Sequence, residues 1–199
     1  MATYLFYLGE VDRARETSRL FSQYSEETYR RHKLVSEGLL HLFQAALFRG
    51  LSGRSEEASS LWAELVEVRR TVTDDQVLKT RRAHYFIYEA YGLAKMKRYS
   101  EIERPSRKGF EGMTAGRGIF QAPHRNSLEY GVASVLEGMA RYASDPSPVE
   151  RDALQSALRQ YKNENVRYGR SGYSVIFDLQ MSYPDIFAQI LPGPDPGKD

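Results

Sequence analysis

The sequence predicts an all-α protein made of stacked helical hairpins, and three observations support this fold class. Short polar turns recur around Gly9, Gly53 and Lys97, and both intervals are 44 residues long (53 − 9 and 97 − 53). Acidic residues follow each turn, as in the first turn of a helix, where carboxylates suit the positive end of the helix dipole. Apolar residues lie at helical spacing before and after the turns.

The apolar pattern around these turns defines the first hairpins. The helix before Gly53 is predicted from Leu39, Leu40, Leu42, Phe43, Ala46, Leu47 and Leu51. The helix after it has a stripe at i, i+3, i+4 and i+7 formed by Ala58, Leu61, Trp62, Leu65 and Val68. The helix before Lys97 is predicted from Ala83, Phe86, Ile87, Ala90, Tyr91 and Ala94. The predicted unit is helix, tight turn, helix, and we expect Trp62 to lie between helices of adjacent units.

The pattern becomes less regular after the third turn. Pro105 falls early in the second helix of the third unit, so we expect that helix to be kinked or restarted there. Residues 112–123 are rich in glycine and predict an irregular connection. A fourth hairpin is predicted from the apolar residues of 128–142 and 153–161, with its turn at Asp145–Pro148.

The end of the chain is predicted to close the array. A polar stretch at 163–172 precedes the hydrophobic segment Tyr173–Leu191, which contains Pro184 and therefore predicts two short helices over the last hairpin. We expect residues 1–191 to form a single helical-repeat domain and residues 192–199, rich in Pro, Gly and charge, to be a disordered tail.

Two sets of residues resemble the tetratricopeptide repeat family in type and spacing. They are Leu42, Ala46, Gly53, Ser55, Ala58 and Trp62, and Phe86, Ala90, Lys97, Tyr99 and Ile102. The resemblance covers residues 1–104 and implies a tetratricopeptide-like α-solenoid. The repeat of 44 residues is longer than the family's period of about 34, and Arg49 and Leu93 replace the usual Tyr before the turn. An irregular helical bundle is the alternative.

The resemblance also implies a concave binding surface lined by the first helix of each unit. Here that surface would present aromatic groups, an amide and a cation, which suit a peptide or a protein loop. The candidate partner-binding residues that it implies are Gln44, His84, Tyr88, Tyr91 and Lys95. The alternative is that the apolar residues beside them, Leu40, Phe43 and Leu47, form core. Arg117 and Phe120 of the glycine-rich connection are further candidates, because they place a charge and an aromatic ring on a loop; a plain linker is the alternative.

Composition limits the remaining classes of function. The chain of 199 residues has no cysteine, which excludes disulfides, thiolate catalysis and cysteine-ligated zinc. The four histidines do not show the spacing of a metal site, and the glycines do not form a phosphate-binding motif. The net charge is only +2, and apolar stretches are too short to span a bilayer. We therefore expect no catalysis, no metal or other cofactor, no membrane partner and a cytoplasmic location.

The favoured function is a non-catalytic module that binds another protein or peptide. Its size, helical build and lack of catalytic residues resemble the immunity proteins of bacterial polymorphic toxin systems, which bind and block a cognate toxin. The alternative is a nucleic-acid-associated or regulatory helical-repeat protein that uses its basic runs, such as Arg69-Arg70 and Arg104 to Lys108. An enzyme with a site around Arg117, His124 and Glu129 is a third alternative.

The amino-terminal segment predicts self-association. Ala2, Leu5, Phe6 and Leu8 resemble the last turns of a helix, and their apolar side chains would face water at the end of a stacked array. We therefore expect either a partner that covers this end or self-association through it, and a homodimer through the amino-terminal helices is the favoured outcome.

Overall fold

The computed structural model describes residues 2–32, 35–72, 82–115, 128–167 and 173–184. Within these ranges the chain forms helices and no strand, which confirms the all-α class. The helices are α1 (Ala2–Tyr7), α2 (Val11–His32), α3 (Val35–Leu51), α4 (Ser55–Thr71), α5 (Arg82–Lys95), α6 (Glu103–Ala115), α7 (Leu128–Ser144), α8 (Pro148–Arg167) and α9 (Tyr173–Ser182). A 3-10 turn, η2 (Tyr99–Glu101), lies between α5 and α6. None of the described helices is long and apolar enough to cross a membrane.

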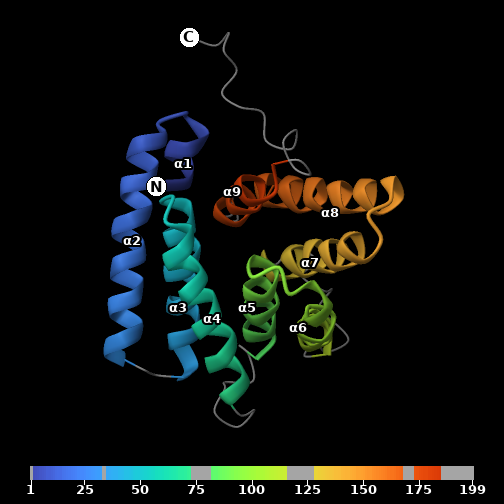
Figure 1. The fold of residues 1–199 in the computed structure, drawn as a ribbon, viewed down its shortest axis with the longest axis horizontal. Coiled ribbons are helices and arrows are strands. Elements are labelled where there is room, and N and C mark those ends of the chain that lie inside the picture. The colour runs from blue at the N-terminus through green and yellow to red at the C-terminus, as the bar shows by residue number, and fades with distance from the viewer. Residues whose placement is uncertain (1, 33–34, 73–81, 116–127, 168–172, 185–199) are drawn as a thin grey trace.

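Consecutive helices pack together as hairpins. α1 packs against α2, α3 against α4, α5 against α6 and α7 against α8, and each hairpin contacts the next one. Figure 1 shows α2 to α5 standing upright beside one another, whereas α7 and α8 lie across them. The fourth hairpin therefore turns away from the direction of the first helices.

The three predicted turns share one backbone geometry. Gly9, Gly53 and Lys97 have positive φ angles of 76°, 88° and 59°. In each turn this residue donates its N–H to the carbonyl three positions earlier, and the next residue donates to the carbonyl five positions before it, at 2.9–3.2 Å. These are the two hydrogen bonds of a Schellman motif, which satisfies the last carbonyls of a helix. The predicted positions of the turns are confirmed.

Trp62 lies in the core between two hairpins, as predicted. It is 1% exposed, and its ring centroid lies 5.5 Å from Phe43 of α3 and 5.4 Å from Tyr91 of α5. Phe43 also packs edge-on against Tyr91. This aromatic cluster joins the second hairpin to the third and buries three large apolar surfaces together.

Small side chains bring α2 close to α3. Ala14, Ser18, Ser22 and Ser25 are all buried and recur along one face of α2. The Ser22 hydroxyl donates to the carbonyl of Ala45 in α3 at 2.8 Å. A mostly polar helix is thus held by close backbone approach, because its buried face consists of small residues.

Pro105 marks a restart of the helix, which was one of the two predicted outcomes. The turn η2 ends at Glu101, α6 begins at Glu103, and Pro105 falls in the first turn of α6. Because the N–H groups of a first turn have no acceptor within their helix, the lack of an N–H on proline costs no helical hydrogen bond there. The prediction of an irregular segment beginning at residue 112 is wrong in part, because residues 112–115 are helical and complete α6. Residues 116–123 lie outside the described residues.

Two further boundaries differ from the predictions. The stretch 163–172 was expected to be a polar connection, but α8 continues through residues 163–167 because helical hydrogen bonding does not require apolar side chains. The turn before α8 follows the prediction: Ser147 accepts the N–H of Glu150 at 3.4 Å and Pro148 is the first helical residue. The tail at 192–199 and the second of the two short helices lie outside the described residues.

The last described helix returns to the beginning of the chain instead of covering the last hairpin alone. α9 contacts α8, but it also contacts α3 and α1, and Figure 1 shows it between α8 and the amino-terminal helices. Phe177 of α9 packs against Phe6 with ring centroids 5.7 Å apart, and Leu5 is 8% exposed. Because Leu5 and Phe6 pack within their own chain, the physical reason for a dimer through them is removed. The oligomeric state itself stays a prediction.

A basic cleft between α4, α5 and α6

The structure does not gather the predicted partner-binding residues into an open groove. Tyr91 is fully buried, and its hydroxyl donates to Asp178 of α9 at 2.5 Å. Lys95 donates to both oxygens of the same carboxylate at 2.9 Å. The surface that the tetratricopeptide resemblance implies is therefore occupied at these two residues by a helix of the same chain.

The other candidates have different surroundings. Tyr88 stacks on Phe43 at 4.5 Å between ring centroids, and Phe43 and Leu47 are buried in the core. Gln44 and His84 are partly exposed on α3 and α5. Arg117 and Phe120 lie outside the described residues.

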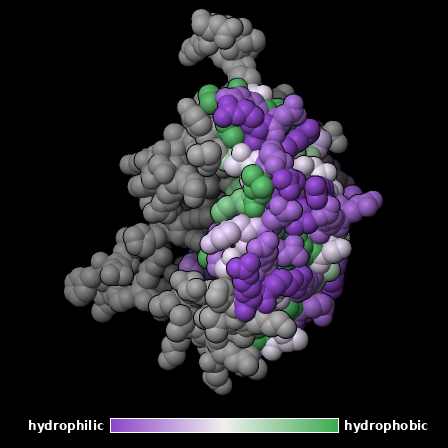
Figure 2. Space-filling model, turned by 90° about the vertical axis from the view of Figure 1, so that its left-hand side faces the viewer, coloured by the Kyte–Doolittle hydropathy of each residue, from purple (hydrophilic) through white to green (hydrophobic). Residues whose placement is uncertain are grey.

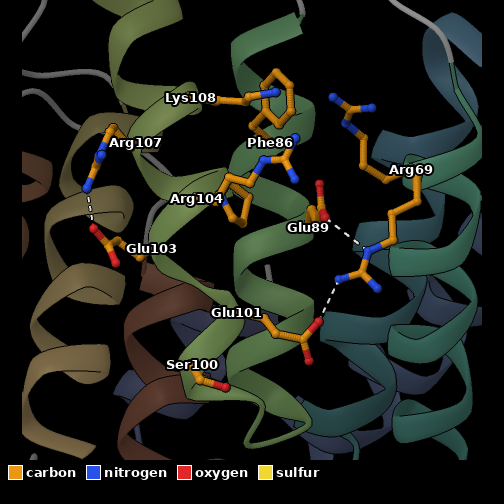
Figure 3. Close-up of a pocket in the computed structure, with 11 residues that line it drawn as sticks. Arg69, Phe86, Glu89, Ser100, Glu101, Glu103, Arg104, Arg107 and Lys108 are labelled. Carbon is orange, nitrogen blue, oxygen red and sulfur yellow. Dashed lines mark hydrogen bonds and ion pairs between the residues drawn. The ribbon is translucent and has the colours of Figure 1, made fainter. Parts of the chain in front are cut away.

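A larger opening lies on a different side of α5. It is a cavity of about 920 Å³ between the end of α4, the outer side of α5 and the start of α6, and we call it the basic cleft (Figure 3). Its lining residues are Arg69, Arg70, Phe86, Glu89, Ser100, Glu101, Glu103, Arg104, Pro105, Arg107 and Lys108. Five of these side chains are cationic and three are carboxylates.

Helix packing brings together two basic runs that are distant in the sequence. Arg69 and Arg70 lie in the last turn of α4, where cations suit the negative end of the helix dipole. Arg104 and Lys108 are four residues apart on α6, so they share one face of that helix. The sequence shows both runs, but a run alone makes no patch, and their meeting depends on how α4 and α6 flank α5.

The carboxylates in the cleft neutralise only part of its positive charge. Arg70 donates to Glu89 at 3.3 Å and to Glu101 at 2.9 Å. Hydrogen bonds from Arg98 and then from Arg70 lower the pKa of Glu101 from 4.5 to about 2, so this carboxylate stays charged near neutral pH. Glu103 pairs with Arg107 one turn along α6, on the side away from Phe86 (Figure 3).

The remaining three cations gather around Phe86. The guanidinium carbon of Arg69 lies 4.0 Å from the centre of the Phe86 ring, and the ammonium of Lys108 lies 5.2 Å from it. Figure 3 shows the Arg104 guanidinium pointing into the space between Phe86 and Glu89. Within the described part of the chain, Arg104 and Lys108 form no ion pair with a carboxylate. We call these four residues the Phe86 cluster.

Arg69 is the fixed member of this cluster. It is only 6% exposed, and its Nη1 donates to the carbonyl of Val72 at 3.3 Å, while its guanidinium packs on the Phe86 ring. Arg104 and Lys108 are exposed. The arrangement can therefore attract an anionic group to the two cations that face solvent beside the Phe86 ring.

Other surfaces offer less defined chemistry. Leu20, Phe21 and Tyr24 are exposed on α2, but Figure 2 shows hydrophilic residues dominating that face of the molecule, with apolar residues in separate spots. The described residues contain no group of three or more His, Asp or Glu side chains suited to a metal ion. The Phe86 cluster is thus the most specific candidate site in this part of the chain.

Comparisons with known proteins leave the site to be interpreted from its own geometry. No family model, curated protein or solved structure matches the chain.

Proposed function

We propose that this protein is a non-catalytic binding module whose basic cleft receives an acidic segment of a partner protein. The observation on which the proposal rests is the convergence of two basic runs on Phe86, since Arg69 of α4 and Lys108 of α6 lie 4.0 Å and 5.2 Å from its ring centre. Such a site attracts negative charge, and its aromatic ring and the stems of the cations add apolar contact area.

The mixed charge of the cleft favours an acidic protein segment over a nucleic acid. Glu89, Glu101 and Glu103 lie among the five cations and would repel a continuous phosphate backbone. A protein segment can place its carboxylates opposite the cations and its polar groups opposite the glutamates. Nucleic-acid binding is the second candidate, because basic residues do line the cleft, and it predicts a much steeper loss of affinity with added salt.

A tetratricopeptide-like array and a toxin-blocking role are the more specific forms of this proposal. The shared turn geometry at Gly9, Gly53 and Lys97 supports a repeated hairpin. The return of α9 onto α5 argues for binding at the outer cleft instead of the concave surface. An immunity protein would use the cleft to cover one acidic surface of its toxin.

Fluorescence anisotropy tests the proposal with a labelled peptide that contains a block of glutamates. We expect the double variant Arg104→Glu/Lys108→Glu to weaken binding by about tenfold or more, because both cations become repulsive. Arg159→Glu, an exposed position on α8, is the control for a single charge reversal away from the cleft and should bind within about threefold of the wild type. Equal binding by the double variant, or tighter and more salt-sensitive binding of single-stranded DNA of the same charge, would overturn the proposal.

A further inference from the structure

We infer that a second, smaller cavity is a binding site for a small aliphatic monocarboxylate. This cavity has a volume of about 230 Å³ and lies where the turns at Gly53 and Lys97 meet α9, and we call it the turn cavity. Its walls come from the end of α3, one face of α4, the end of α5 and the last turns of α9. It shares no lining residue with the basic cleft, so the inference goes beyond the proposed function and does not depend on it.

Trp62 provides a buried donor at the inner end of the turn cavity. It lines the cavity although it is only 1% exposed, and its indole Nε1 has no hydrogen-bond acceptor among the described residues. Because helical side chains lean towards the start of their helix, the ring extends from α4 towards the turn where the cavity lies. A buried N–H without an acceptor costs free energy, and a ligand oxygen in the cavity can remove that cost.

The start of α4 supplies further donors at the mouth of the same cavity. Ser55 is the first residue of α4, and Ser59 and Trp62 follow it at i+4 and i+7 on the face that lines the cavity. The first N–H groups of a helix have no acceptor within the helix, and the side chain of Arg54 at the N-cap forms no capping hydrogen bond with them. The acidic residues of this turn do not line the cavity. This end of α4 therefore favours an anionic ligand group.

The charges of the lining side chains select a monoanion. Lys95 donates to both oxygens of Asp178, so these two charges neutralise each other. Lys97 is exposed and forms no ion pair within the described part of the chain. One carboxylate balances Lys97, whereas a phosphate monoester, with a charge of about −1.5 to −2 at neutral pH, exceeds it.

The backbone at Lys97 supports a role for its side chain. Its φ of 59° suits glycine, and glycine does occupy the equivalent position in the turns at Gly9 and Gly53. A residue held in a conformation that disfavours its Cβ atom is typical of functional sites. The lysine in the third turn places its cation beside the cavity, and Gly53 in the second turn leaves open space, since an added Cβ would meet no atom within 4 Å.

The size and apolar lining of the cavity define the rest of the ligand. Its volume of about 230 Å³ is about eight times the share of one water molecule in the liquid, which is about 30 Å³. The cavity therefore holds a molecule of only a few carbon atoms. Ala58, Met181 and the ring of Trp62 add apolar surface, which suits a short aliphatic chain. Butyrate has this combination of one carboxylate and a short chain, so it is the probe of choice.

The test follows the indole N–H directly. Because Trp62 is the chain's single tryptophan, its indole gives one signal in a proton–nitrogen correlation spectrum. Titration of the full chain with sodium butyrate should move this signal in a saturable manner. Butanamide, which has the same chain without the charge, and sodium chloride at equal ionic strength should not. Lys97→Gln should weaken butyrate binding by about fivefold, because it removes the cation that balances the carboxylate. Lys108→Gln, which removes a cation of the basic cleft, is the matched control and should retain the wild-type affinity.

The outcomes separate the inference from the proposed function. An indole signal that does not move with butyrate, or that moves equally with butanamide or sodium chloride, would overturn the carboxylate site. An unchanged butyrate affinity in Lys97→Gln would place the anion elsewhere and overturn it as well. Glutamine keeps the Cβ atom of lysine, so the variant tests the charge and not the backbone of the turn. Failure of the acidic peptide to bind would affect only the proposed function, since the two sites share no lining residue.

Discussion

Tyr91 of α5 donates a hydrogen bond of 2.5 Å to Asp178 of α9, a residue 87 positions later in the chain. Lys95, one turn further along α5, donates to both oxygens of the same carboxylate at 2.9 Å. Burial, and then the adjacent Asp178 carboxylate, raises the pKa of Tyr91 well above its usual value, so the phenol remains protonated and serves as a donor. This cluster fixes the last described helix to the middle of the array.

We expect Asp178→Ala to lower the free energy of unfolding by about 3 kcal/mol, because it removes the carboxylate that accepts from both a nearly buried ammonium and a buried hydroxyl. Urea denaturation followed by circular dichroism measures the change. Asp152→Ala, at an exposed position on α8, is the control and should change stability by less than about 0.5 kcal/mol. A loss below about 1 kcal/mol for Asp178→Ala would show that apolar contacts alone hold α9.

Trp62→Ala should lower the free energy of unfolding by roughly 3–5 kcal/mol, since Trp62 is 1% exposed between Phe43 and Tyr91. The replacement leaves a cavity between the second and third hairpins. Because Trp62 is the chain's single tryptophan, circular dichroism and not fluorescence should follow the denaturation. A loss below about 1 kcal/mol would contradict its place in the core.

Lys97→Gly should stabilise the protein by about 1 kcal/mol, because Lys97 has a φ of 59° that disfavours residues with a Cβ atom. Gly53 provides the matched reverse test, since it has a φ of 88° and an added Cβ would meet no atom within 4 Å. Gly53→Ala should therefore destabilise by about the same amount through its backbone alone. If both variants raise the Tm in thermal denaturation, or both lower it, the two turns are not equivalent.

Glu101 should make stability depend on pH in the acidic range. Its pKa falls from 4.5 to about 2 on folding, so its stabilising effect is complete above about pH 4.5 and is lost as the pH falls towards 2. The Tm of the wild type should therefore approach that of Glu101→Gln as the pH falls from about 5 to about 2. These two pH values follow from the pKa of Glu101 in the unfolded and folded states. Glu56→Gln, an exposed position on α4, is the control. A Tm difference that stays constant over this range would contradict the Arg98 and Arg70 pairing.

Local signals made much of the fold predictable. The turns at Gly9, Gly53 and Lys97 follow from residue types within a few positions, and the restart at Pro105 follows from the missing N–H of one residue. The core position of Trp62 was predictable because an apolar stripe at helical spacing indicates the buried face of a helix. The small-residue face of α2 was harder to recognise, because alanine and serine provide close packing without strong hydrophobicity.

The candidate site was less predictable, because its parts are distant in the sequence. Arg69 and Lys108 are 39 positions apart (108 − 69) and meet only at Phe86. The prediction of a concave surface at Tyr91 and Lys95 assumed that the array stays open, and the return of α9 fills that space. Nothing in the spacing of apolar residues specifies such a return.

The sequence by itself determined the all-α class, the positions of three turns and the core position of Trp62, since each depends on backbone preferences or periodicity within about 20 residues of chain. Only the tertiary structure decided that α9 packs against α3 and α5, and that cations of α4 and α6 meet at Phe86. The physical reason is that these contacts depend on the angles between hairpins. Those angles arise from the packing of whole helices against one another, which no single segment of the sequence encodes.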